Sequence, residues 1–282
     1  MAKKKQKVRE KKYLPSPINN KMLNYAVYVM SPAEKLLYAF LIFVVGGLAG
    51  LIFYGGLFKE DGAATTATYI SSAVIFALVG GIAIKVFLPM MKDMLKQKRN
   101  KVLQQQFMNL LETLSTSLAA GNSLRDAFFN AKDDLLGQYD EKAMIIVEVS
   151  EIVAGVKNGN TIEEMLTDFG ARSGNEDIVN FANVISNCYR LGGNFSSVVR
   201  RTREIIGDKV AVADEIETKI ASNKMQLNVM CTMPVVLVGM LKISSAQFAE
   251  SLASVLGILV TTVAIGIFVG AYFWGRKIID IG

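Results

Sequence analysis

Four long apolar stretches constrain what this chain can fold into more than any other feature of its sequence. A membrane-spanning helix needs about 20 predominantly apolar residues to cross about 30 Å of hydrocarbon. The first stretch carries no charged residue, and the second is interrupted only by Lys85, close enough to one end to reach the headgroups. The sequence therefore predicts four transmembrane helices, at residues 36–58, 70–90, 227–243 and 252–275.

The third stretch is the shortest and contains Pro234. Its length also fits a helix buried in a soluble core. We favour a membrane span, because only four spans place all the basic flanking segments on one side. Pro234 would kink this span, which we interpret first as packing geometry and second as a hinge.

Lysines and arginines are concentrated on one side of the predicted spans. The first 35 residues hold nine of them, and five more follow the second span, between residues 92 and 101. The loop after the first span has only Lys59, and residues 244–251 have none. Because cytoplasmic flanks carry the excess of basic residues, we expect a multi-pass inner-membrane protein with both termini and its central segment in the cytoplasm.

The lysine-rich N-terminus raises the alternative of nucleic-acid binding. It lacks the interleaved aromatic residues that would stack on bases, so we expect no nucleic-acid partner. We interpret it instead as a disordered tail that fixes the topology and contacts anionic membrane lipids. The predicted organisation is a basic segment (1–35), a pair of spans (36–90), a cytoplasmic domain (91–226), a second pair of spans (227–277) and a short tail (278–282).

Apolar residues of the central domain recur with the period of a helix throughout. The predicted buried stripes are Phe107, Leu110, Leu111, Leu114 and Leu118; Leu124, Ala127, Phe128, Ala131 and Leu135; Ile145, Val149, Ile152, Val153 and Val156; and Ile178, Phe181, Ala182, Ile185, Cys188 and Tyr189. No segment of the domain alternates with period two for long enough to predict a strand. The predicted fold class is all-α, with four transmembrane helices and a cytoplasmic bundle of about six helices.

Short turns between these helices carry a more specific signal. Three times a helix is expected to stop at a Gly-Asn pair: Gly121-Asn122, Gly159-Asn160 and Gly193-Asn194, the last preceded by Gly192. Glycine accepts the left-handed conformation that ends many helices. Ser123, Thr161 and Asn194 can each cap the next helix, and Thr161 with Glu164 fits a capping box. Such links make antiparallel helical hairpins, and the residue pattern of a tetratricopeptide repeat is absent.

A last long helix is predicted to start at Phe195 and to run towards the third span, since no proline occurs before Pro234. Its expected buried stripe is Phe195, Val198, Val199, Thr202, Ile205 and Ile206, continued by Ile216 and Ile220.

The sequence offers no catalytic or metal-binding constellation. It contains no histidine, which removes the commonest general base and metal ligand. Gly192-Gly193 lacks the Gly-Lys-Ser/Thr that completes a phosphate-binding loop. Cys188 and Cys231 are expected to stay reduced, as small buried residues. We therefore expect no enzymatic activity and no cofactor.

Two sets of residues are candidates for contacts with partners. Arg200, Arg201 and Arg203 would form an electropositive patch for an acidic protein surface or lipid headgroups, although an ordinary solvated helix face explains them equally well. Glycines four residues apart inside the first and fourth spans allow close helix approach, either within one protomer or in a dimer: Gly46 and Gly50, and Gly266 and Gly270.

Several of these features together resemble a known family. The sequence YRLGGNF at residues 189–195, followed by Val198-Val199 and Met233-Pro234, resembles the second half of a type II secretion F domain. The sequence LAAGNSL at residues 118–124 resembles its first half, and the resemblance covers roughly residues 100–240. One such domain between two pairs of spans resembles the platform proteins of tight-adherence (Tad/Flp) pili, TadB and TadC.

This resemblance implies an inner-membrane platform that contacts a cytoplasmic secretion ATPase and pilin subunits, and that pairs with itself or with a second F-domain protein. The long lysine-rich N-terminus departs from the family pattern. A small transporter is a weaker alternative, because few polar residues are available inside the spans: Lys85, Thr232, Thr261 and Thr262. A membrane-anchored signalling scaffold would differ only in its partners.

Overall fold

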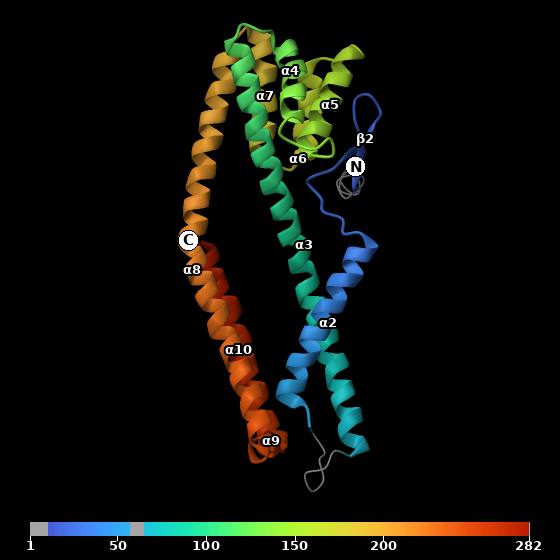
Figure 1. Cartoon of the computed structure of the whole chain (residues 1–282), viewed down its shortest axis with the longest axis vertical. Helices are drawn as coiled ribbons and strands as arrows, with labels where there is room; N and C mark the ends of the chain where they lie inside the picture. The colour runs from blue at the N-terminus through green and yellow to red at the C-terminus, as the bar shows by residue number, and fades with distance from the viewer. Residues whose placement is uncertain (1–10, 57–64, 282) are drawn as a thin grey trace. The chain divides into compact units, whose positions relative to one another are not determined.

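The computed structural model describes residues 11–56 and 65–281, and helices make up most of them, which confirms the all-α fold class. The helices, shown in Figure 1, are α2 (Pro32–Tyr54), α3 (Thr66–Ala119), α4 (Leu124–Leu136), α5 (Met144–Lys157), α6 (Ile162–Ser173), α7 (Glu176–Leu191), α8 (Phe195–Ser244), α9 (Ala246–Ala253) and α10 (Val255–Ile281).

The chain folds as two compact units. The bundle unit combines the segment up to Val29 with Lys92–Val212, and the membrane unit combines Met30–Met91 with Ala213–Gly282. The predicted domain boundaries at residues 90 and 226 both fall inside helices, the first of them beside the boundary between the units at Met91. Helix α3 runs through Pro89 as one helix, and α8 runs through Pro234 as one helix, as predicted for the segment after Phe195.

The bundle unit buries its core between the second half of α3, the whole of α4 to α7 and the start of α8, six helical segments in all. Phe107 lies in this core with its ring edge-on to Phe169 and Phe181, at centroid distances of 6.3 and 5.5 Å. The predicted stripes of α3, α4, α5 and α7 are confirmed as core, except for Tyr189, which is half exposed, and Val156, which is partly buried.

The predicted stripe on α8 is too wide. Val199 and Ile206 are buried, but Ile205 and Ile216 are exposed. Ile205 is one position from Ile206 and so points about 100° away around the helix. Ile216 lies beyond Val212, where the bundle unit ends.

Left-handed glycines stand at four turns of the bundle. Gly121 and Gly159 each have φ of +91°, and Gly192, rather than Gly193, ends α7 with φ of +72°. The fourth, Gly174, has φ of +63° and precedes Asn175, which caps α7. The sequence analysis overlooked this fourth Gly-Asn pair.

Polar side chains close the same turns. Asn122 donates to the Ser117 hydroxyl at 3.0 Å, and Asn160 donates to the Met165 sulfur at 4.0 Å. The Asn194 side chain accepts a hydrogen bond from the backbone N–H of Ser197 at 3.2 Å. Thr161 and Glu164 form the predicted capping box at the start of α6.

The segment before α2 differs most from the sequence interpretation, which treated residues 1–35 as a disordered tail. Residues 1–10 lie outside the described residues. From there β1 (Tyr13–Pro15) and β2 (Lys21–Leu23) pair as an antiparallel hairpin, with Leu14 opposite Met22. Met22 and Tyr25 are buried against the bundle. Burial of these two side chains orders the segment, although its composition is rich in charged residues.

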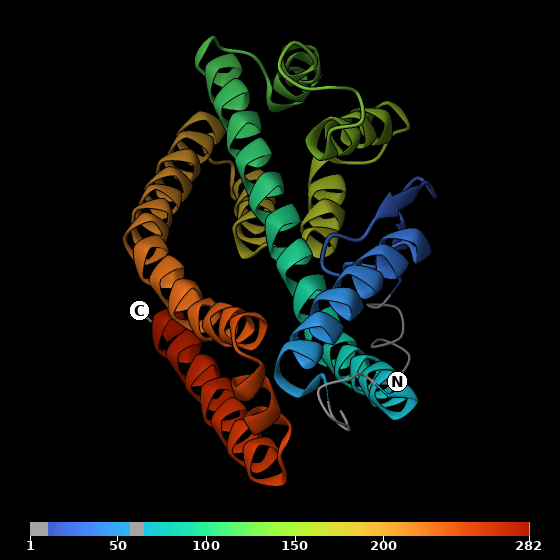
Figure 2. The same ribbon diagram turned by 60° about the horizontal axis from the view of Figure 1, so that its bottom comes forward.

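The membrane unit contains the four apolar stretches, each of them largely within a helix long and apolar enough to cross a membrane. The stretch predicted at 252–275 begins in α9 and continues in α10, which starts at Val255. The first helix begins earlier than predicted, at Pro32, and ends at Tyr54, while the rest of the predicted stretch includes residues outside the described ones. The predicted 244–251 loop is mostly the short helix α9, which packs beside α10 (Figure 2).

Glycines pack α2 against α3. A Cβ atom on Gly46 would lie 2.6 Å from the Ala83 Cβ, and one on Gly50 would lie 2.9 Å from the Val79 Cβ. Gly266 and Gly270 of α10 have no such neighbour within 4 Å among the described residues. The first glycine pair therefore serves packing within this chain, and the second pair faces open space.

Candidate functional site

The three candidate arginines lie on the first turns of α8, but the structure separates them. Arg203 donates to the Glu112 carboxylate of α3 at 3.0 Å, in an ion pair that remains largely exposed. Arg200 and Arg201 are exposed and form no ion pair within residues 11–56 and 65–281. Arg203 thus helps to hold α8 against α3. Arg200 and Arg201 remain as positive charges on the surface of α8.

The turn that precedes these arginines exposes an unusual apolar residue. Leu191, the last residue of α7, is 86% exposed, while the Tyr189 ring packs on Phe195 at a centroid distance of 5.3 Å. Arginine and aromatic residues are enriched at protein interfaces. The corner between α7 and α8 therefore presents chemistry that suits a protein partner.

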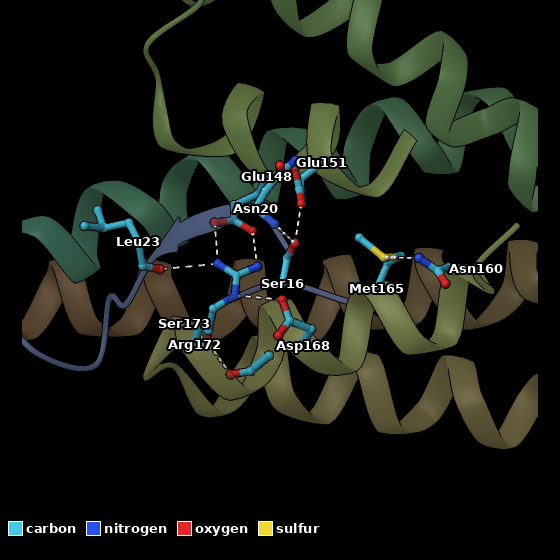
Figure 3. A network of polar contacts seen from close by, with 11 residues as sticks. Ser16, Asn20, Leu23, Glu148, Glu151, Asn160, Met165, Asp168, Arg172 and Ser173 are labelled. Atoms are coloured by element: carbon cyan, nitrogen blue, oxygen red, sulfur yellow. Dashed lines mark hydrogen bonds and ion pairs between the residues drawn. The ribbon is translucent and has the colours of Figure 1, made fainter. Parts of the chain in front are cut away.

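A buried ionic network joins α5 and α6 within the bundle (Figure 3). Arg172 of α6 donates through both terminal nitrogens to the Glu148 carboxylate of α5, at 2.8 Å each, and through Nε to Asp168 at 2.7 Å. The Arg172 and Glu148 side chains are only 2% and 1% exposed. A bidentate, desolvated pair of this kind is directional and fixes the distance between two helices.

The same network reaches the N-terminal hairpin. The Ser16 hydroxyl donates to Glu151 at 2.6 Å, and the Asn20 amide donates to the other oxygen of that carboxylate at 2.9 Å. Arg172 also donates to the Leu23 carbonyl at 3.3 Å (Figure 3). We call residues 12–29 the strap, because this segment is bonded across the bundle surface.

The strap is also fixed where it leaves the hairpin. The backbone N–H groups of Tyr25 and Ala26 donate to the Arg172 carbonyl at 2.8 and 3.2 Å. Arg99 of α3 donates to the Tyr25 and Val27 carbonyls, at 2.9 and 3.0 Å, and its guanidinium stands 5.0 Å from the centre of the Tyr28 ring. Three helices, α3, α5 and α6, therefore hold the strap.

Burial and charge set the ionisation of these groups. Burial alone would lower the pKa of Arg172, but its hydrogen bonds and attraction to Glu148 and Asp168 raise that pKa above its usual value. Burial, together with the negative Glu148, raises the pKa of Tyr25, whose hydroxyl hydrogen-bonds this carboxylate. Arg172 therefore stays charged and Tyr25 stays protonated at neutral pH.

Sequence reasoning missed this network, although a signal for it exists. Glu148 stands three residues after Ile145 and four before Ile152, and so lies on the apolar face of its helix. Arg172 likewise stands three residues after the buried Phe169. A charged residue within a predicted stripe indicates either that the core is interrupted or that the charge is buried in an ion pair. Glu148 and Arg172 form such a buried ion pair.

The membrane unit contains an apolar cleft of about 500 Å³ among α2, α3, α8 and α10. Cys231 lies in its wall. Near one end of α2, the Lys242 ammonium of α8 donates to the last carbonyls of the helix, including that of Ile52 at 3.0 Å. A cation at a helix C-terminus is favourable, because it meets the unpaired carbonyls and the negative end of the dipole.

Residues that could hold a metal ion would need three or more histidine, cysteine or acidic side chains close together. The part of the chain that the structure describes has no such group. Cys188 and Cys231 are both free thiols.

Comparison with known proteins relates part of the chain to one family. Residues 110–243 match the family model of the type II secretion system (T2SS), protein F, while no curated protein and no solved structure matches the chain. The matched range includes all of α4 to α7 and most of α8, and it excludes the strap and Arg99. Such a domain implies a platform component of secretion or pilus-assembly machinery. This chain, with four helices suited to a membrane, thus carries a type II secretion system protein F domain at residues 110–243.

Proposed function

We propose that this protein is an inner-membrane platform component of a Tad/Flp-type pilus or a related secretion machine. It would couple a cytoplasmic secretion ATPase to the assembly of pilin subunits, without catalysis of its own. The observation that carries this proposal is the protein F domain whose first and last helices, α3 and α8, continue without a break into apolar spans. A displacement of the bundle by a partner would be carried along these two helices.

The proposed topology places the bundle and both termini in the cytoplasm, with four passes through the membrane. The distribution of basic residues around the spans supports this orientation. The basic residues between positions 3 and 9, which lie outside the described residues, would contact anionic lipid at the same surface: Lys3, Lys4, Lys5, Lys7 and Arg9.

Cysteine labelling in cells tests the topology. In a chain with Cys188 and Cys231 replaced by alanine, single cysteines are placed at two exposed positions, Lys142→Cys before α5 and Gln247→Cys in α9. We expect a membrane-impermeant maleimide to label position 247 in spheroplasts, and position 142 only after lysis. The reverse pattern would contradict the orientation.

The proposed ATPase contact is the corner between α7 and α8 with Arg200 and Arg201. The paired change Arg200→Glu and Arg201→Glu is expected to abolish co-purification of the secretion ATPase at moderate salt. The matched control is Lys132→Glu with Lys142→Glu, an equal change of charge near α4, which is expected to leave recovery unchanged. Equal recovery in both variants would remove the arginines from the contact but leave the platform role standing.

A second copy of this chain, or a second F-domain protein, is the proposed partner within the membrane. The open side of Gly266 and Gly270 supports this choice, since small residues allow two helices to approach closely. Leucine at both positions is expected to reduce the oligomer size measured in detergent by light scattering. Leucine at Gly81, which also has open space around it, is the control and should not change the size.

A further inference from the structure

We infer that the strap, residues 12–29, transmits movement of the bundle to the first membrane helix, α2. The strap precedes the residues that match the protein F family, so the family assignment does not supply this role. The inference concerns contacts within one chain, and its test does not depend on the platform function.

The strap has two anchors of different kinds. At its tip, Ser16 and Asn20 both donate to the Glu151 carboxylate of α5. At its root, Arg99 of α3 and Arg172 of α6 bind several backbone groups between residues 23 and 27. The strap is therefore fixed at both ends.

The root cannot slide along the bundle without losing these bonds. The guanidinium groups and the Arg172 carbonyl bind particular backbone atoms of Leu23, Tyr25, Ala26 and Val27. Gly174 adds a steric reason, because a Cβ atom there would lie 2.6 Å from the Ala26 Cα. A shift by one residue would unpair donors and acceptors that are largely shielded from water.

The link from the root to α2 is very short. Val27 is the last strap residue whose backbone is bonded to Arg99, and the bundle unit ends at Val29. Helix α2 begins at Pro32, with Ser31 as its cap. The four residues from Tyr28 to Ser31 therefore separate the last backbone anchor from the helix, and they span at most about 14 Å when fully extended. The capping box of Ser31 and Glu34, with proline at the first helical position, fixes the start of the helix. The length of the link limits how far the root can be displaced before it acts on the first turn of α2.

Amide hydrogen exchange of the full chain in lipid nanodiscs tests this coupling. Arg99→Ala removes the anchor nearest to α2, and exchange at residues 26–29 is expected to rise about tenfold or more, given the strength of hydrogen bonds from charged donors. With the link at its native length, exchange in the first turn of α2 should rise as well. Arg99→Lys, which keeps the charge, should show a smaller rise at both places, and Arg99→Gln gives an intermediate reading if the alanine variant does not fold.

The control separates coupling from a general loss of stability. Six Gly-Ser residues inserted between Val29 and Met30 should abolish the response of α2 to Arg99→Ala, while the strap still exchanges faster. The same insertion between Lys11 and Lys12 lengthens the chain without lengthening the link, and should leave the response intact. The inference is overturned if α2 does not respond at native link length, or if it responds equally with the lengthened link.

Discussion

The bundle unit and the membrane unit use the same helix, α3, in opposite ways. In its second half, Phe107 and Leu110 are fully buried against other helices of the bundle. In its first half, Leu78 and Ile82 are 62% and 64% exposed. Burial of apolar surface from water drives helices together in the bundle, whereas lipid tails are as apolar as leucine and provide no such drive. An outward-facing apolar side chain is thus expected in the first half of α3, which belongs to the membrane unit. In the second half, which belongs to the bundle, it would be an anomaly.

The two units therefore hold their helices together by different contacts. The bundle interdigitates large side chains and adds a buried ionic network around Arg172. The membrane unit relies on close approach at glycines between α2 and α3, and on the Lys242 ammonium at the carbonyl end of α2. Each difference can be tested by making the same kind of substitution in both units.

The largest contrast is expected for truncation of a phenylalanine. Phe107→Ala should lower the free energy of unfolding of the bundle by about 3–5 kcal/mol, because it removes a fully buried ring and leaves a cavity. Phe40→Ala on the exposed face of α2 should cost less than about 1 kcal/mol, since lipid replaces the lost contacts. Amide hydrogen exchange measures the loss in the bundle for Phe107→Ala. Fluorescence of the single tryptophan, Trp274, follows unfolding of the membrane unit for Phe40→Ala. A cost at Phe40 comparable to that at Phe107 would mean that another chain covers this face.

A similar loss is expected when the buried ion pair of the bundle is broken. Arg172→Met should cost about 3–5 kcal/mol, because Glu148 would remain buried without its partner. Arg203→Met, which breaks the exposed pair with Glu112, should cost no more than about 1 kcal/mol. Adding Glu148→Leu to Arg172→Met should recover part of the loss, as the uncompensated charge is then removed. If Arg172→Met and Arg203→Met lower the free energy of unfolding equally, the buried network stabilises the bundle no more than an exposed ion pair does.

The sequence predicted the elements of the bundle well, because periodicity reports burial directly. The stripe from Phe107 to Leu118 and the capping box of Thr161 follow from spacing alone, and both are present. Spacing also marks a helix face too broadly, which is why Ile205 was wrongly assigned to the core. Nothing in the local sequence distinguishes the edge of a buried face from the exposed surface beside it.

Contacts between distant residues could not be predicted in this way. The strap was interpreted as part of a tail because the many lysines of residues 1–35 outweigh two buried residues, Met22 and Tyr25, in any local average. Glu151 and Ser16 are 135 positions apart, so only the fold shows that they meet. Of the candidate arginines, sequence could not distinguish Arg203, whose partner Glu112 lies on another helix, from its two exposed neighbours.

A smaller effect is expected from adding a methyl group where α2 and α3 touch. Gly46→Ala places its Cβ 2.6 Å from that of Ala83, and overpacking of this kind typically costs about 1–3 kcal/mol. The reciprocal change Ala83→Gly should restore most of the stability. Gly81→Ala, with no neighbour within 4 Å in the described chain, should be neutral or slightly stabilising, since alanine favours a helix. Trp274 fluorescence during unfolding in detergent measures all three variants, and equal losses at positions 46 and 81 would refute the close contact.

The smallest effect should be the same in both units, because it concerns backbone groups rather than apolar side chains. Ser31 caps α2 in the membrane unit and Thr161 caps α6 in the bundle, each within a capping box whose hydrogen bonds are exposed. Ser31→Ala and Thr161→Ala should each cost about 1 kcal/mol, the usual value for losing a helix cap. Amide exchange in the first turn of each helix measures the loss. A far larger cost at Ser31 would show that this cap also carries tension from the strap, since the two boxes are otherwise alike.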